Sequence, residues 1–177
     1  LINYAYDEFL LPRCYRPPLN SETTIALRNF LEQRWGRMTG DAPRKLCVLF
    51  LVNAKSGCSY WRCEEPARVL SSVYGEDLYV DVTEDLEFNS MLMFDVIVVQ
   101  RGLFGPTMAP LVHTVVSKLK AAGKKIVYEI DDDLDHIPAT NSVFFSLDPR
   151  ERRLINWLRE TSDAIICSTE TLRDVIG

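Results

Sequence analysis

The spacing of apolar residues along this chain changes near Lys45. From there on, short apolar runs alternate about five times with segments in which apolar residues recur every three or four positions. Continuous runs are typical of strands covered on both faces, and the wider spacing is typical of amphipathic helices. The alternation predicts an α/β fold with a doubly wound, Rossmann-like parallel sheet of about five or more strands flanked by helices. The predicted strands are Leu46–Val52, Leu78–Val82, Phe94–Gln100, Ile126–Ile130 and Ala164–Cys167.

The segment between the third and fourth predicted strands has the clearest helical pattern. Its apolar residues fall on one face, and Gly123 follows its end, as helix C-termini favour. We expect a helix over Thr107–Ala122 that buries Leu111, Val115 and Leu119 against the sheet. We also expect the first predicted strand, the longest apolar run, to lie at the centre of the sheet.

The same spacing predicts further helices elsewhere in the chain. The one that follows the first strand carries acidic residues in its first turn, where the helix dipole favours them. We predict a helix from about Arg62 that buries Cys63, Ala67, Leu70 and Tyr74, a short helix or turn over Asp85–Met91, a helix over Arg150–Glu160 that buries Leu154, Ile155 and Leu158, and a last helix from Thr169.

Residues 1–44 differ from the rest, with several prolines and tyrosines near the start. One stretch within them has helical spacing, with Asn20 or Ser21 as its N-cap and Gly36 at its end. We therefore expect an N-terminal extension with one amphipathic helix over residues 1–44 and an α/β domain over residues 45–177. The apolar face of that helix is formed by Leu27, Phe30, Leu31 and Trp35.

Composition and charge exclude several classes of function. With 47% hydrophobic and 25% charged residues, the chain is typical of a globular protein. Its net charge of -5 argues against a nucleic-acid partner, because binding phosphates requires a basic face. No apolar run approaches the length of a membrane span, and no signal peptide is visible. We expect a cytoplasmic protein that binds no nucleic acid and has no membrane span.

The five cysteines are odd in number, form no CxxC pair and have no histidine clustered with them. A zinc site requires paired spacings, and a secreted disulfide-rich domain requires an even, dense set. We therefore expect neither a zinc site formed by these cysteines nor a disulfide framework. Cys47, Cys63 and Cys167 lie in apolar runs and are predicted to be small buried residues, which fits a reducing compartment.

Ligands bind to open parallel sheets at the carboxyl ends of the strands, so the loops that follow the strands are the candidate sites. In the first loop, Gly57 stands among small and hydroxyl residues ahead of a helix, where backbone N–H groups can meet an anionic or hydroxyl-rich ligand. An ordinary turn with Gly57 at positive φ explains the same residues. Neither a Walker A nor a GxGxxG pattern is present, so no nucleotide cofactor is expected. Tyr60 and Trp61 either stack on a sugar or base or pack within the protein.

Three adjacent carboxylates, Asp131, Asp132 and Asp133, follow the fourth predicted strand and repel one another unless something compensates. Strand alternation would direct Asp131 and Asp133 to one side of the sheet and Asp132 to the other. The compensating group is a divalent cation, a helix N-terminus capped by one aspartate, or an arginine such as Arg62 or Arg101.

Three other residues at these ends are candidates for chemistry. Arg101 and Gly102 follow the third predicted strand, as a cation that faces a ligand and a glycine that permits close approach. His136, just after the aspartates, is either a general base or a hydrogen-bonded loop residue.

Three segments resemble the N-terminal domain of GT-B glycosyltransferases. Ser56–Arg62 with Pro66–Leu70 resembles the first loop and helix of that domain. Gly123–Leu134 is similar to its fourth-strand segment, and Asp163–Leu172 looks like its fifth strand. The resemblance covers about residues 45–177 and implies the first half of a two-domain enzyme that transfers a sugar from a nucleotide donor to an acceptor. In that family the N-terminal domain mainly holds the acceptor, the C-terminal domain binds the nucleotide sugar, and a bound metal is usually not required.

The resemblance also implies roles for particular residues. Asp131–Asp133 would face the interdomain cleft, where one of them would orient the acceptor hydroxyl or contact the transferring sugar. The family's donor-binding acidic motif is missing from this sequence, so the domain by itself is expected to be inactive and to meet the nucleotide sugar only through a C-terminal domain. The predicted catalytic residues are Asp131, Asp132 and Asp133, and the predicted substrate-binding residues are Gly57, Tyr60, Arg62, Arg101, Gly102, Ser168 and Thr169.

Two other classes of function fit the same residues. A metal-dependent GT-A-like transferase would use Asp131–Asp133 as a cation site that holds the donor diphosphate. That fold commonly places a nucleotide-binding loop after its first strand, and no such loop is distinguished here. A non-catalytic binding or scaffolding module would instead dock a partner through the N-terminal helix.

Overall fold

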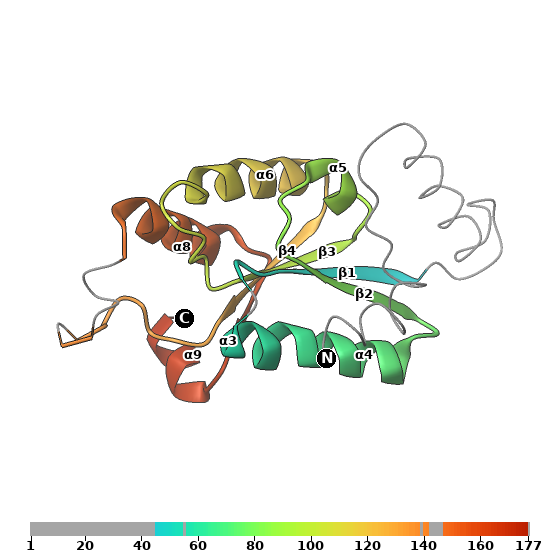
Figure 1. Cartoon of the computed structure of the whole chain (residues 1–177), viewed down its shortest axis with the longest axis horizontal. Coiled ribbons are helices and arrows are strands. Elements are labelled where there is room, and N and C mark those ends of the chain that lie inside the picture. Colours follow the sequence, from blue (N-terminus) through green and yellow to red (C-terminus); the bar gives the residue numbers. More distant parts are fainter. Residues whose placement is uncertain (1–44, 55, 139, 142–146, 177) are drawn as a thin grey trace. The chain divides into compact units, whose positions relative to one another are not determined.

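The computed structural model of the chain describes residues 45–54, 56–138, 140–141 and 147–176. The predicted N-terminal extension and its amphipathic helix lie outside these residues. The strands form one all-parallel sheet in the order β2-β1-β3-β4-β5 (Figure 1), which confirms the predicted Rossmann-like α/β fold. The strands are β1 (Leu46–Leu51), β2 (Leu78–Thr83), β3 (Val96–Gln100), β4 (Lys125–Ile130) and β5 (Ala164–Cys167).

Helices cover both faces of the sheet (Figure 1). After β1 the chain forms one continuous helical segment, made of α3 (Gly57–Ser59), the π-helix η2 (Tyr60–Glu64) and α4 (Glu65–Tyr74). This segment lies on one face, whereas α6 and α8 pack together on the other. The remaining helices are α5 (Phe88–Met91), α6 (Ala109–Ala121), α8 (Pro149–Thr161) and α9 (Glu170–Ile176).

The order of the strands reverses between β1 and β3. The crossover from β1 leads outward to β2, and the crossover from β3 leads in the opposite direction to β4. Because the two crossovers run in opposite directions, their helices lie on opposite faces of the sheet. The loops that leave β1 and β3 therefore separate at the position where open α/β sheets bind ligands.

The face of the sheet against α4 buries an apolar cluster that turns polar at one end. The cluster includes Val98 of β3 and Cys63 of η2, and Val127 of β4 packs against it. Cys63 is buried, as predicted. Because strand side chains alternate between the two faces, Gln100 and Glu129 lie on this same face, two residues further along β3 and β4. The apolar core against α4 thus continues into two buried polar side chains.

Some predictions about burial and position are wrong. Leu111 is 45% exposed while Val112 beside it is fully buried, because apolar spacing gives the direction of a buried stripe but not its width. Tyr74 is exposed in the last turn of α4. Cys167 is only half-buried, since β5 is an edge strand with a neighbour on one side. β1 is an inner strand as expected, but β3 holds the central place.

The substitutions Leu119→Ala and Leu111→Ala remove the same atoms from α6 at a buried and at an exposed position. Leu119 is fully buried, so its truncation leaves a cavity and should lower the free energy of unfolding by about 2–5 kcal/mol. Leu111→Ala should change that free energy by no more than about 0.5 kcal/mol. Urea denaturation followed by circular dichroism measures both, and equal losses would contradict the buried face described for α6.

Candidate functional site

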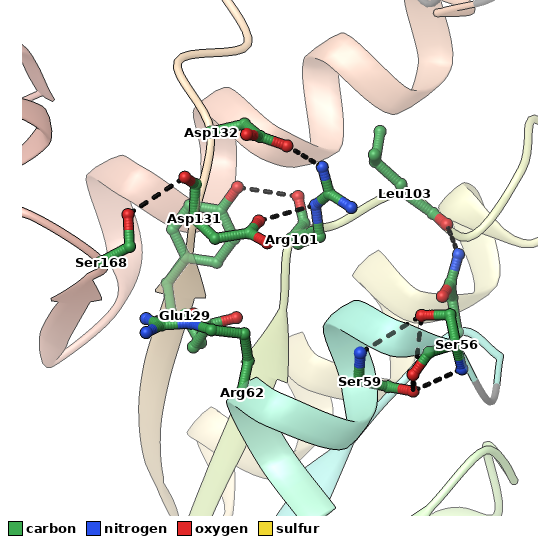
Figure 2. Close-up of polar contacts among 11 residues, drawn as sticks. Ser56, Ser59, Arg62, Arg101, Leu103, Glu129, Asp131, Asp132 and Ser168 are labelled. Atoms are coloured by element: carbon green, nitrogen blue, oxygen red, sulfur yellow. Dashed lines mark hydrogen bonds and ion pairs between the residues drawn. The ribbon is translucent and has the colours of Figure 1, made fainter.

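The loops after β1, β3, β4 and β5 meet along one side of the sheet, which we call the carboxyl edge (Figure 2). The side-chain amide of Asn53 donates to the backbone oxygen of Leu103, which joins the loop after β1 to the loop after β3. The hydroxyl of Ser168 donates to the backbone oxygen of Asp131 at 3.0 Å, which joins the ends of β5 and β4. The ion pair of Arg101 with Asp131 joins the ends of β3 and β4, so the candidate loops form one connected polar region.

The helix that follows β1 begins with a capping box at Ser56. The Ser56 hydroxyl accepts from the N–H of Ser59 at 3.2 Å, and the Ser59 hydroxyl accepts from the N–H of Ser56 at 2.7 Å. Gly57 is the first residue of α3, does not have a positive φ, and a Cβ added to it would meet no atom within 4 Å. The alternative of a positive-φ turn at Gly57 is therefore wrong. Neither conformation nor packing requires a glycine at this exposed position.

The π-helix η2 carries three of the candidate side chains. A π-turn inside a longer helix is rare and is frequently found at functional sites. The rings of Tyr60 and Trp61 contact each other edge to face, with their centroids 5.0 Å apart, and Trp61 is exposed. Arg62 points to the sheet, where it reaches β4 (Figure 2). Of the two alternatives predicted for these rings, packing within the protein is therefore observed between Tyr60 and Trp61.

The carboxylate of Glu129 lies inside the protein, with the residue 1% exposed. Nε and Nη2 of Arg62 each lie 2.6 Å from Oε1 of Glu129. Burial raises the pKa of Glu129, and the guanidinium of Arg62 offsets only part of that rise. Arg62 was a candidate partner for the aspartates, but it pairs with Glu129 instead.

Glu129 and Gln100 are absent from the predicted site residues although both are buried at the carboxyl edge. Each lies within a predicted strand, whereas the candidate sites are predicted in the loops that follow the strands. The sequence does contain a signal, because a lone polar side chain in a strand covered on both faces must find a partner. Glu129, between the apolar Tyr128 and Ile130, is the clearer of the two cases.

Arg101 turns back over the end of β4 from an unusual backbone conformation. Its φ of 53° lies in the left-handed region, which is uncommon for residues other than glycine. Its backbone oxygen accepts from the hydroxyl of Tyr128 at 2.8 Å, and its Nε lies 2.8 Å from Oδ1 of Asp131. Gly102, also at positive φ, is buried, and a Cβ there would come within 3.0 Å of Ile155 in α8. Packing against α8 therefore explains the glycine.

The three aspartates do not alternate as predicted, because β4 ends at Ile130 and strand geometry stops with it. Asp131 and Asp132 both contact the guanidinium of Arg101 (Figure 2). Asp133 turns into its own loop. Arg101 is thus the observed compensating charge for two of the three carboxylates.

Asp133 forms a small local hydrogen-bonded unit with His136. Its Oδ1 accepts from the N–H groups of Asp135 and His136 at 3.2 Å each, and its Oδ2 lies 2.8 Å from Nδ1 of the imidazole. Desolvation acts to raise the pKa of Asp133, but these hydrogen bonds outweigh it and the pKa is lowered. His136 is thus hydrogen-bonded within its loop through Nδ1, and its role as a general base stays a prediction. Among the described residues, no group of three or more His, Cys, Asp or Glu side chains is placed to hold a metal ion.

Ser168 and Thr169 follow β5 with different partners. Ser168 joins β5 to β4, as described above, and is exposed to ligands. The hydroxyl of Thr169 accepts from the N–H of Leu172 at 3.1 Å and so caps the start of α9. A local structural role accounts for Thr169.

Comparison of the chain with protein-family models, with curated proteins and with solved structures found no match. Within the part of the chain that the structure describes, no helix is long and apolar enough to cross a membrane.

Replacing Arg62 with Met should leave the buried carboxylate of Glu129 without a counter-charge. Breaking a buried pair from one side is expected to cost about 3 kcal/mol of the free energy of unfolding near neutral pH. Because burial favours the neutral form of this carboxyl more than water does, the loss should grow as pH rises above the ordinary range of a glutamate and shrink below it. Urea denaturation at several pH values measures the effect.

The double variant Arg62→Met/Glu129→Leu is the control for that experiment. It removes both charges and should recover most of the lost stability, because apolar residues of similar volume replace a buried pair without penalty. A loss in Arg62→Met that is independent of pH, or that the second substitution does not relieve, would rule out the buried-charge explanation.

Proposed function

We propose that residues 45–177 are the acceptor-side half of a two-domain glycosyltransferase of the GT-B type. The observation that carries the proposal is the meeting of polar side chains from separate loops at the carboxyl edge, beside the reversal of strand order between β1 and β3. Open parallel sheets bind their ligands at this position. The resemblance of three segments to the GT-B family supplies the reaction class, the transfer of a sugar from a nucleotide donor to an acceptor hydroxyl.

Asp132 is the aspartate best exposed to an acceptor in this proposal. Its side chain is 56% exposed, whereas that of Asp131 is 14% exposed and lies against Arg101. Asp131 therefore holds Arg101 in place, and Asp132 hydrogen-bonds the acceptor hydroxyl that attacks the sugar. Tyr60 and Arg62, on η2, line the acceptor side.

The nucleotide sugar would be bound by a second domain. Arg62 and Arg101 lie at the carboxyl edge, and both are already paired with carboxylates. A diphosphate needs unpaired cations or free backbone N–H groups, so these arginines are poorly suited to hold a donor. The division of roles in the GT-B family matches this distribution of charge.

We expect the chain to bind UDP-glucose and GDP-mannose weakly or not at all, because its edge arginines are neutralised by carboxylates. Isothermal titration calorimetry of the chain with each nucleotide sugar is the measurement. A micromolar dissociation constant for either one would refute the division between acceptor and donor domains and would favour a transferase that binds its donor alone.

The competing hypothesis gives Asp131–Asp133 a divalent cation. It requires carboxylate oxygens that Arg101 and His136 already occupy. We therefore expect Mg²⁺ and Mn²⁺ to leave the melting temperature of the chain unchanged. Differential scanning fluorimetry of the parent and of Asp131→Asn/Asp133→Asn measures this, and a saturable rise in the parent that disappears in the variant would establish the cation site.

A further inference from the structure

Nε2 of Gln100 and Oε2 of Glu129 are buried polar atoms with no hydrogen-bond partner among the described residues. The two residues are 3% and 1% exposed. Leaving a buried amide or carboxylate atom without a partner costs free energy, so each such atom in a native protein calls for an explanation. Here one atom is a donor and the other an acceptor.

The two side chains are neighbours. Gln100 and Glu129 are register partners in the parallel pair of β3 and β4, and paired residues of adjacent strands direct their side chains to the same face. Two residues earlier in these strands, Val98 belongs to the apolar cluster against α4 and Val127 packs on it. The side chains of Gln100 and Glu129 therefore lie on the face of the sheet that α4 covers. The donor and the acceptor therefore stand side by side at the carboxyl end of the apolar core.

Arg62 accounts for one oxygen of Glu129 and leaves the other. Its Nε and Nη2 both contact Oε1, so Oε2 retains its capacity to accept a hydrogen bond. The side chain of Arg62 is 27% exposed whereas that of Glu129 is 1% exposed, and the two lie against each other at the carboxyl edge (Figure 2). Because Gln100 and Glu129 are almost fully buried, a ligand would reach the pair only past the side chain of Arg62.

The chemistry of the pair selects the kind of group that fits. A hydroxyl donates one hydrogen bond and accepts others, so it matches an amide donor beside a carboxylate acceptor. A phosphate, carboxylate or ammonium group would lose its hydration beside a pair whose two charges are already matched, which costs more free energy than it does for a neutral group. A neutral group with both hydrogen-bonding roles is therefore preferred over either charged group.

We propose that Gln100 and Glu129 form a binding site for one hydroxyl of a neutral sugar, with Arg62 as its outer wall. The inference rests on the proposed function and makes it more specific, because it defines the acceptor as an uncharged saccharide and names the atoms that recognise it. Glu129 and Gln100 act by direct contact, and Arg62 acts by holding the carboxylate.

The test compares sugars that share one ring and differ in charge. The probes are methyl β-D-glucoside, methyl β-D-glucuronide and methyl β-D-glucosaminide, together with the corresponding galactosides and mannosides to cover ring stereochemistry. Saturation-transfer and chemical-shift NMR on the parent chain give relative affinities. At least one neutral glycoside should bind about tenfold more tightly than its charged counterparts, the equivalent of one hydrogen bond lost to a misplaced charge.

Two variants separate recognition from structural support. Gln100→Met removes the donor at similar length and should weaken the neutral glycoside about tenfold. Glu129→Gln removes the charge at constant shape and should reduce the discrimination against the glucuronide. Glu160→Gln makes the same chemical change at an exposed position of α8 and should behave as the parent does.

The outcomes distinguish the inference from the proposed function. If glycosides bind and both site variants keep the affinities of the parent, the inference is overturned and the proposed function stands. A loss of stability in Gln100→Met with unchanged binding would mean that the pair holds an internal water, and would overturn it as well. If the folded parent binds no glycoside, both are overturned. Because Glu129→Gln preserves shape, it keeps the test decisive if Gln100→Met fails to fold.

Discussion

A carboxylate inside an apolar sheet requires a counter-charge, and the pair of Glu129 with Arg62 meets this requirement. Taking the carboxylate out of water costs several kcal/mol, which a well-placed guanidinium offsets in part. The partners lie 67 positions apart in the chain, so the pair ties the first crossover segment to the fourth strand. Within η2, Arg62 turns to this carboxylate while Cys63 beside it stays in the apolar cluster. Two contacts of η2 therefore meet the sheet side by side, the ion pair of Arg62 and the apolar packing of Cys63.

The electrostatic character of the carboxyl edge follows from how its arginines are used. Arg62 and Arg101 are shared among three carboxylates, those of Glu129, Asp131 and Asp132. This group carries an excess of negative charge, which disfavours the phosphates of a nucleotide and tolerates a neutral sugar. Under the proposed function, the same excess of negative charge would disfavour the nucleotide-sugar donor and favour an uncharged acceptor.

The fold was largely predictable from the sequence, because strand and helix periodicities are local signals. β5 was predicted without error, and the other strands to within two residues at each end. The width of a buried stripe was not predictable, and Leu111 turned out exposed.

The site was only partly predictable. Arg101 and the aspartates were found by their position after strands, but their pairing depends on a left-handed turn that the sequence does not encode locally. Glu129 was overlooked because it stands within a strand.

Departures from local rules concentrate at the carboxyl edge, and their concentration is an argument about function. Glu129 is an acid buried in a sheet, Arg101 has a left-handed conformation without being glycine, and η2 interrupts an α-helix with a π-turn. Each of these carries a cost in stability that ordinary packing would avoid. Chance would scatter such costs over the fold, whereas here Glu129 contacts η2 through Arg62, and Arg101 contacts the loop that follows Glu129. Natural sequences tolerate local conflict mainly where function requires it, so this edge is where binding chemistry is expected.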